Sequence, residues 1–225
     1  MKSEYLMFNI LILLGPLLLS FDRKVHYVSR WKKVMTAIIL VLIPFVVWDS
    51  LATGIHWWFN SAYTLDFRIA QLPVEEWLFF ISAPFAVLFI WEIFEKRIGN
   101  PVSEKLKIIP KYLTLAILPG ILFIWLGKVY TGLTLVSLGI AGLLEIALKV
   151  EVLSRKNSYP FFAIVIFLIL IFNGYLTARP VVLYDPAYQL DFRIITIPIE
   201  DFGYGFALIL LNIIIFEKLK ENLNG

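Results

Sequence analysis

Seven apolar runs divide this chain at regular intervals. They cover residues 4–21, 34–53, 75–95, 109–127, 129–148, 159–178 and 199–217. A membrane-spanning helix needs about 20 mostly apolar residues, and each run is close to that length. At 60% hydrophobic residues, the chain carries more apolar surface than a soluble domain buries. We therefore predict an all-α, polytopic membrane bundle of about seven helices.

One segment of the chain occurs twice, 125 residues apart. Residues 63–76 read YTLDFRIAQLPVEE, and residues 188–201 read YQLDFRIITIPIED. The same offset places the fifth apolar run over the first. We therefore expect one membrane domain built as two three-helix repeats, about 4–96 and 129–220, joined by a connecting helix at about 107–127.

The single connecting helix determines how the two repeats are oriented. An odd number of helices between them returns the chain to its starting side, so the repeats are predicted to be parallel. Both copies of the repeated segment then open onto the same face of the membrane, and their acidic residues can converge there.

Lysine and arginine are concentrated on the opposite side. Of 20 such residues, that side carries Arg23, Lys24, Arg30, Lys32, Lys33, Lys96, Arg97, Lys105, Lys107, Lys111, Lys149, Arg155, Lys156, Lys218 and Lys220. The side of the repeated segments carries Lys2, Arg68, Lys128, Arg179 and Arg193. Positive charge favours cytoplasmic loops. We predict an inner-membrane protein with its N-terminus outside and its C-terminus cytoplasmic, and no nucleic-acid partner.

Each repeated segment ends in two neighbouring acids at the start of an apolar run, Glu75 and Glu76 in the first copy and Glu200 and Asp201 in the second. Proline followed by acids is also an ordinary helix start, because free N–H groups and the helix dipole stabilise negative charge there. Two copies at a membrane boundary favour a functional role, since ionisable groups at membrane depth are costly. In a cluster of four acids, repulsion and desolvation favour one neutral proton donor beside one ionised acceptor.

Polar side chains near the acids are candidates for supporting roles. The two Asp/Arg pairs in the preceding loops are expected either to form ion pairs that fold the loop or to tune the acids. Two further residues lie at the height of the acids near the ends of the second and sixth runs. These candidates are Asp66, Arg68, Asp191, Arg193, Asp49 and Asn173. Glu92 and Glu145 lie toward the other side and are interpreted as structural.

Aromatic residues are dense around the acids. Most of them are typical of the interfacial belt of a membrane protein. Trp77, Phe202 and Tyr204 are the best placed to line a site and to stabilise a carbocation by cation–π attraction.

Several kinds of site are missing from the sequence. There is no cysteine, and the two histidines are far apart, so we predict no metal site. There is no dinucleotide fingerprint or phosphate-binding loop, and no Asp-rich motif for Mg²⁺ on a diphosphate. We therefore expect no cofactor. No mid-membrane lysine is available for a retinal Schiff base, which argues against a rhodopsin.

The chain resembles the membrane-type carotenoid cyclases, the lycopene cyclase domains found as two subunits or as one fused chain. The resemblance runs over nearly the whole length. It rests on Pro73-Val74-Glu75-Glu76 and Pro198-Ile199-Glu200-Asp201, on Trp48-Asp49 at the end of the second run, and on the Asp-Phe-Arg before each acidic motif.

The resemblance implies a redox-neutral cyclisation of lycopene. A carboxylic acid protonates the terminal alkene of a ψ-end, the internal double bond attacks the resulting cation, and a base removes a ring proton to leave a β-ionone ring. Our hypothesis gives the acid and base roles to Glu75 and Glu200, with Glu76 and Asp201 setting their protonation. Which residue donates stays open. A fused chain is expected to need no partner subunit besides its carotenoid substrate and membrane lipid.

Two other classes of function remain open. A small-solute transporter can also be built from two parallel three-helix repeats, although its polar site is expected near mid-membrane. A scaffold for carotenoid enzymes would leave the acids replaceable. The product ring type (β, ε or γ), a C40 or C50 substrate and the oligomeric state also stay open.

Overall fold

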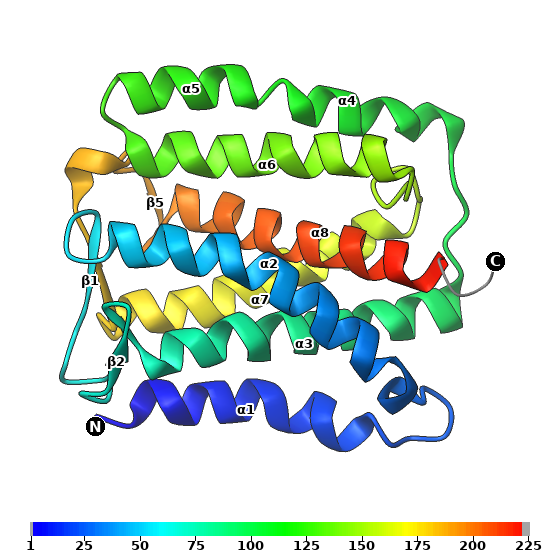
Figure 1. Ribbon diagram of the computed structural model, residues 1–225, viewed down its shortest axis with the longest axis horizontal. Helices are drawn as coiled ribbons and strands as arrows, with labels where there is room; N and C mark the ends of the chain where they lie inside the picture. The colour runs from blue at the N-terminus through cyan, green and yellow to red at the C-terminus, as the bar shows by residue number, and fades with distance from the viewer. Residues whose placement is uncertain (1, 222–225) are drawn as a thin grey trace.

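The computed structural model describes residues 2–221 as a bundle of roughly parallel helices (Figure 1). Its long helices are α1 Glu4–Leu19, α2 Trp31–Ala52, α3 Val74–Ile98, α6 Val129–Leu148, α7 Ser158–Ala178 and α8 Ile199–Glu221. The connecting segment consists of the 3-10 helix η2 Glu104–Ile108, α4 Ile109–Thr114 and α5 Ile117–Trp125. Two short 3-10 helices, η1 Tyr27–Arg30 and η3 Pro186–Tyr188, lie in loops.

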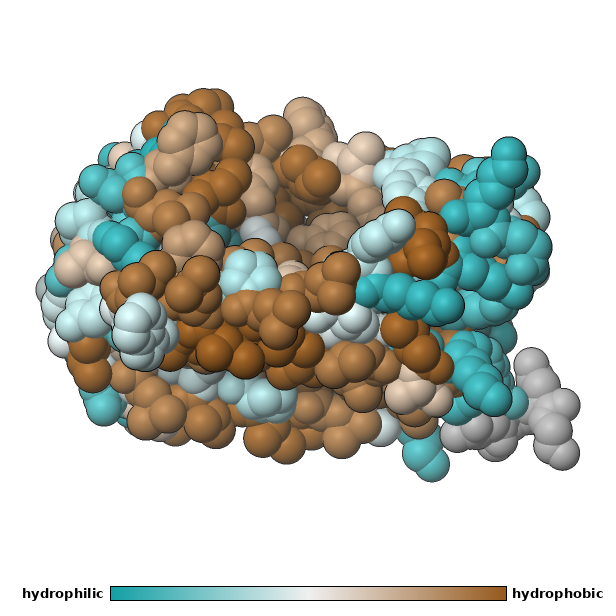
Figure 2. All heavy atoms as spheres, turned by 90° about the horizontal axis from the view of Figure 1, so that it is seen from above, coloured by the Kyte–Doolittle hydropathy of each residue, from teal (hydrophilic) through white to brown (hydrophobic). Residues whose placement is uncertain are grey.

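The described helices fit a membrane by length and composition. Six segments are long and apolar enough to cross one, and α1 is a shorter apolar helix of 16 residues. Figure 2 shows apolar side chains gathered around the middle of the molecule, with hydrophilic side chains toward both ends. The prediction of an all-α membrane bundle of about seven helices is confirmed.

The connecting segment departs from the continuous helix expected there, because it is interrupted between α4 and α5. Pro119 has no N–H to donate to the carbonyl of Leu115, and its ring crowds that carbonyl. The chain tightens instead into i→i+3 bonds at this point, including Leu118 N to the Leu115 carbonyl at 3.2 Å. In membrane helices, local 3-10 adjustments of this kind satisfy the backbone groups that a proline leaves free.

The connecting segment lies alongside α6 (Figure 1). Glycines lie where the two backbones approach each other. A Cβ atom on Gly132 would lie 2.6 Å from the Gly120 carbonyl oxygen, and one on Gly142 would lie 2.7 Å from the Pro110 carbonyl oxygen. Small residues allow such close backbone approach between membrane helices. The connecting segment is thereby held on one edge of the bundle, next to the second repeat.

Short strands cap the end of the bundle at which α3 and α8 begin. Strand β1 Trp57–Phe59 pairs antiparallel with β4 Val182–Tyr184. Two hairpins, β2 Arg68–Ile69 with β3 Leu72–Pro73 and β5 Arg193–Ile194 with β6 Ile197–Pro198, lie immediately before α3 and α8. The labelled strands lie together at this end, and α8 finishes at the other (Figure 1).

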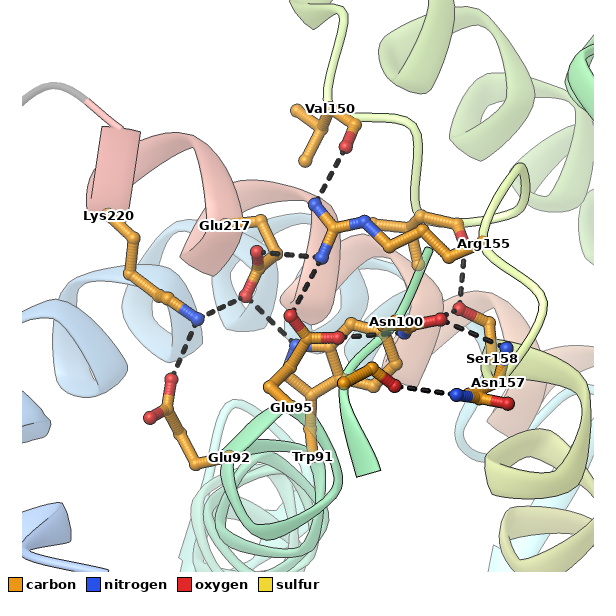
Figure 3. A network of polar contacts seen from close by, with 12 residues as sticks. Trp91, Glu92, Glu95, Asn100, Val150, Arg155, Asn157, Ser158, Glu217 and Lys220 are labelled. Atoms are coloured by element: carbon orange, nitrogen blue, oxygen red, sulfur yellow. Dashed lines mark hydrogen bonds and ion pairs between the residues drawn. The ribbon is translucent and has the colours of Figure 1, made fainter. Parts of the chain in front are cut away.

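The opposite end of the bundle is closed by a polar network (Figure 3). Arg155, in the loop between α6 and α7, bonds both Glu95 of α3 at 3.0 Å and Glu217 of α8 at 3.1 Å. Lys220 bridges Glu217 at 2.6 Å and Glu92 at 2.8 Å. The 125-residue offset relates Glu92 to Glu217, so one lysine holds equivalent carboxylates of the two repeats together.

Candidate active site

The repeated hairpins determine where the four acids lie. Each hairpin folds back on itself and leads directly into a helix whose first turn carries two acids. The first acid of each pair is tied to the loop before the hairpin. Glu75 Oε1 accepts the Leu65 N–H at 2.7 Å, and Glu200 Oε1 accepts the Leu190 N–H at 2.8 Å. The two copies use the same bond at positions 125 residues apart.

The second acid of each pair accepts a hydrogen bond from a tyrosine. Tyr5 of α1 donates its hydroxyl to Glu76 Oε2 at 2.7 Å. Tyr130 of α6 donates to Asp201 Oδ1 at 2.6 Å. These pairs are also related by the offset, and all four side chains are buried. Each repeat therefore contributes one buried tyrosine–carboxyl pair.

The two pairs differ in their further partners. Asp201 Oδ2 also accepts a hydrogen bond from the Tyr184 hydroxyl at 2.9 Å and one from Asn173 Nδ2 at 3.3 Å. Burial, together with the neighbouring Asp201 carboxyl, raises the pKa of Tyr184 well above its usual range, so its hydroxyl stays protonated and donates. For Glu76, the Tyr5 hydroxyl is the side-chain donor within residues 2–221.

A third carboxyl belongs to the same site. Asp49, in the last turn of α2, is buried and accepts the Tyr204 hydroxyl from α8 at 2.9 Å. The offset relates Asp49 to Gly174, so the second repeat has no equivalent acid. Asp49 therefore makes the site asymmetric.

These three carboxyls line one apolar cavity of about 290 Å³ between α1, α3, α7 and α8. We call it the reaction slot. It extends along α3 from Glu76 to Ile90, about 21 Å at 1.5 Å per residue. Beyond the carboxyls, apolar side chains such as Val87, Ile169 and Leu208 dominate its lining. The slot therefore suits a long, thin hydrocarbon whose end reaches the acids.

Aromatic rings surround the acidic end of the slot. The ring of Tyr130 lies 5.0 Å from that of Trp57 and is stacked on that of Tyr184 at 6.1 Å. Tyr204 completes this wall, with its ring 4.9 Å from that of Trp48. Aromatic faces attract a nearby cation, so the wall suits a carbocation at this end of the slot.

Several residues expected at the site lie away from the slot. Glu75 and Glu200 hold loops and do not line it. Trp77 donates its Nε1–H to the Ile69 carbonyl at 3.1 Å, and Phe202 packs against the main hydrophobic core. Of the three aromatic candidates, Tyr204 alone lines the slot.

The loop pairs also lie elsewhere than on the slot. Asp66 is exposed and pairs with Lys2 at 2.7 Å rather than with Arg68. Arg68 donates to the Gln71 carbonyl and Arg193 donates to the Thr196 carbonyl, each at the turn of its own hairpin. Asp191 is exposed. These residues shape the hairpins that carry the acids.

Sequence reasoning selected Tyr204 but missed two other tyrosines of the site, Tyr5 and Tyr130. Tyr5 and Tyr130 lie 125 residues apart, as do Glu76 and Asp201. Extending the offset comparison from the acidic motifs to the start of each repeat would have identified them. Tyr184 and Trp57 carry no comparable signal, because strand pairing in the outer loops brings them to the slot.

Within residues 2–221, no three side chains of the metal-binding types are grouped to hold a metal ion. A family model described as lycopene cyclase matches the chain over residues 2–94 and again over residues 127–219. The two matched segments correspond to the two repeats and together cover most of the chain. A search of curated proteins and a search of solved structures each found no match.

Proposed function

Because the chain belongs to the lycopene cyclase family, in the fused two-repeat form, we propose that it is an intramolecular lyase that closes the ψ-ends of lycopene into β-ionone rings. One observation carries the mechanism. Glu76, Asp49 and Asp201 meet at one end of a slot whose remaining lining is mostly apolar. A hydrocarbon offers no polar group for recognition, so its selection depends on shape and on the acids at its end.

The hydrogen bonds support different roles for the two repeat-related acids. Asp201 accepts three side-chain hydrogen bonds, and donors of this kind stabilise the ionised form of a carboxyl. Glu76 accepts one such bond. Glu76 is therefore the proton donor, and Asp201 is the anion that faces the cation and accepts the proton. This assignment moves both roles away from Glu75 and Glu200, whose Oε1 atoms accept loop amides.

The reaction then needs one proton to enter and one to leave. Glu76 adds its proton to the terminal alkene, which leaves a tertiary cation. The internal double bond attacks that cation, forming the carbon–carbon bond that closes the ring and moving the positive charge onto the ring. Asp201 removes a ring proton, and the electrons of that C–H bond form the ring double bond. The molecular formula is unchanged and no electrons are exchanged.

Asp49 and the aromatic wall have supporting roles. Asp49 accepts the Tyr204 hydroxyl and thereby fixes the ring of Tyr204 beside the slot. The faces of Tyr204, Tyr130 and Trp57 further stabilise the charge. Preorganised groups of this kind lower the barrier because they need not reorient as charge develops.

The dimensions of the slot support a substrate that enters one end at a time. A volume of about 290 Å³ is at the low end for drug-sized ligands, so it holds one end of a C40 chain while the remainder lies in lipid. The second end reacts after release and rebinding. Both repeats are present in one chain, which acts without a partner subunit.

The charge distribution supports the orientation in the membrane. Positive residues gather at the end of the bundle that carries the Arg155 network, which favours a cytoplasmic location for that end. The acids then lie in the outer half of the inner membrane. The N-terminus is outside and the C-terminus is cytoplasmic.

The decisive experiment is expression in a bacterial host that accumulates lycopene, followed by separation of the pigments by HPLC. We expect the wild-type chain to convert lycopene to γ-carotene and β-carotene, and Glu76→Gln to leave lycopene unchanged. Unchanged lycopene with wild-type protein verified in the membrane, and with an elongated C50 substrate also unchanged, would reject the proposal. Uptake of labelled solutes by vesicles would then test the transporter alternative.

A further inference from the structure

A second apolar cavity lies on the other side of the aromatic wall. It has a volume of about 610 Å³ and is lined by α2, α6 and α8. We call it the second groove. Its lining contains no carboxyl group, and its polar side chains are His56, Ser137 and the indole of Trp48. A cavity of this composition suits an apolar ligand and has no carboxyl group that could donate a proton to an alkene.

The second groove and the reaction slot are built from equivalent positions of the two repeats. Pro44 and Leu51 of α2 line the groove, and the offset relates them to Ile169 and Leu176 of α7, which line the slot. The equivalent helices α3 and α8 show the same relation. Leu211 and Ile215 of α8 line the groove, and their equivalents Ala86 and Ile90 of α3 line the slot. The two cavities are therefore related by the internal symmetry of the bundle.

One equivalent pair distinguishes the cavities. Asn173 lines the slot and donates to Asp201, whereas its equivalent in the groove is Trp48. The Trp48 ring lies 4.9 Å from that of Tyr204 and 6.2 Å from that of Tyr130. Both tyrosine hydroxyls bond acids of the slot. Trp48 thus occupies in the groove the position that Asn173 occupies in the slot, and its ring separates the groove from the acids.

We propose that the second groove binds a linear polyene of the same class as the substrate, in a position where it cannot react. The proposal rests on the proposed function, because the slot identifies the ligand class. Equivalent positions line equivalent shapes, so the groove takes the same kind of chain. Trp48 and Tyr204, whose rings lie 4.9 Å apart, keep the end of that chain away from the carboxyls.

The chain offers a matched pair of variants for the test. Ile215 lines the groove and Ile90 lines the slot, both are half-buried, and the offset relates them. The wild type, Ile215→Trp and Ile90→Trp would be purified from a lycopene-accumulating host in lipid nanodiscs. Bound carotenoid per chain would be measured by absorbance and HPLC, and cyclisation would be measured separately in the cells. Leu51→Trp repeats the test at a groove position that is 71% exposed and tolerates a larger side chain.

We expect Ile215→Trp and Leu51→Trp to lower bound carotenoid by about half, from two sites to one, with cyclisation unchanged. Ile90→Trp should lower bound carotenoid and abolish cyclisation. Carotenoid content equal to wild type in both groove variants would overturn the inference, and would leave lipid acyl chains as the occupant. If the groove variants lose pigment while the wild type forms no rings, the second site stands and the proposed cyclisation fails.

Discussion

Trp58 and Leu183 pair directly across the β1–β4 sheet, and they are the same position in the two repeats. On either side of them, Trp57 pairs with Tyr184, the equivalent of Phe59, and Phe59 pairs with Val182, the equivalent of Trp57. This pattern, in which i contacts j and j contacts i, marks a two-fold axis. The axis passes through the capping sheet at the acidic end, which explains why acids of both repeats reach one slot.

The first prediction separates the two acids within each motif. Glu76→Gln and Asp201→Asn should each lower cyclisation at least about 100-fold, because each removes an acid–base group. Glu75→Gln and Glu200→Gln should retain most activity, since an amide oxygen still accepts the Leu65 or Leu190 N–H. Pigment analysis in lycopene-accumulating cells measures all four, normalised to protein in the membrane. Loss of cyclisation in Glu75→Gln and Glu200→Gln, with activity retained in Glu76→Gln and Asp201→Asn, would assign the acid and base roles to Glu75 and Glu200.

The second prediction concerns the donors to Asp201. Tyr184→Phe and Tyr130→Phe each remove one hydroxyl donor from this carboxyl without changing the ring. Loss of a hydrogen bond to a charged group costs about 1.5–3 kcal/mol, so we expect each variant to lower the cyclisation rate roughly 10-fold to 100-fold. Tyr175→Phe, whose hydroxyl bonds Glu4 away from the slot lining, serves as the control. Rates equal to wild type in both variants would argue against Asp201 as the anion.

The third prediction tests the network at the opposite end of the bundle. Arg155→Met leaves Glu95 and Glu217 without their shared partner, and breaking a buried ion pair in this way costs about 3 kcal/mol. A thermal melt in detergent should show a clear drop in midpoint. Lys107→Met is the control, because Lys107 pairs with Glu104 and Glu151 at the surface and such pairs contribute under about 1 kcal/mol. Equal melting temperatures for the two variants would show that the Arg155 network does not stabilise the fold.

The fourth prediction addresses orientation. Because the chain has no cysteine, single cysteines can be introduced without background. Asn60→Cys and Ala187→Cys should react with a membrane-impermeant thiol reagent in intact cells, while Lys105→Cys should react only after the cells are opened. Labelling in the reverse pattern would invert the orientation.

The helices were predictable because apolar run length is a local property of the chain. Residues 75–95 were expected to form a span, and α3 covers Val74–Ile98. The break near Pro119 was missed, because prolines inside α1, α2 and α3 leave those helices continuous. Whether proline interrupts a helix depends on its neighbours, and these are not visible in the local sequence.

The site was less predictable than the fold. The repeat identified the acidic motifs but not which acid of each pair faces the slot. That choice depends on the hairpin, whose loop amides take the Oε1 atoms of Glu75 and Glu200. Asp49 and Asn173 were expected near the acids from their height in the membrane, and both line the slot. Trp57 and Tyr184 reach it through strand pairing between distant loops, which no local pattern indicates.

Trp48 and Asn173 can differ because both repeats lie in one chain. Two identical subunits would have the same residue at both positions, so both cavities would be open to the acids or both would be closed. Joining the repeats covalently removes this constraint, and each position can be selected separately. Asp49 and Gly174 show the same freedom. Fusion therefore allows equivalent surfaces to diverge, in our proposals toward chemistry on one side of the axis and toward holding an unreacting chain on the other.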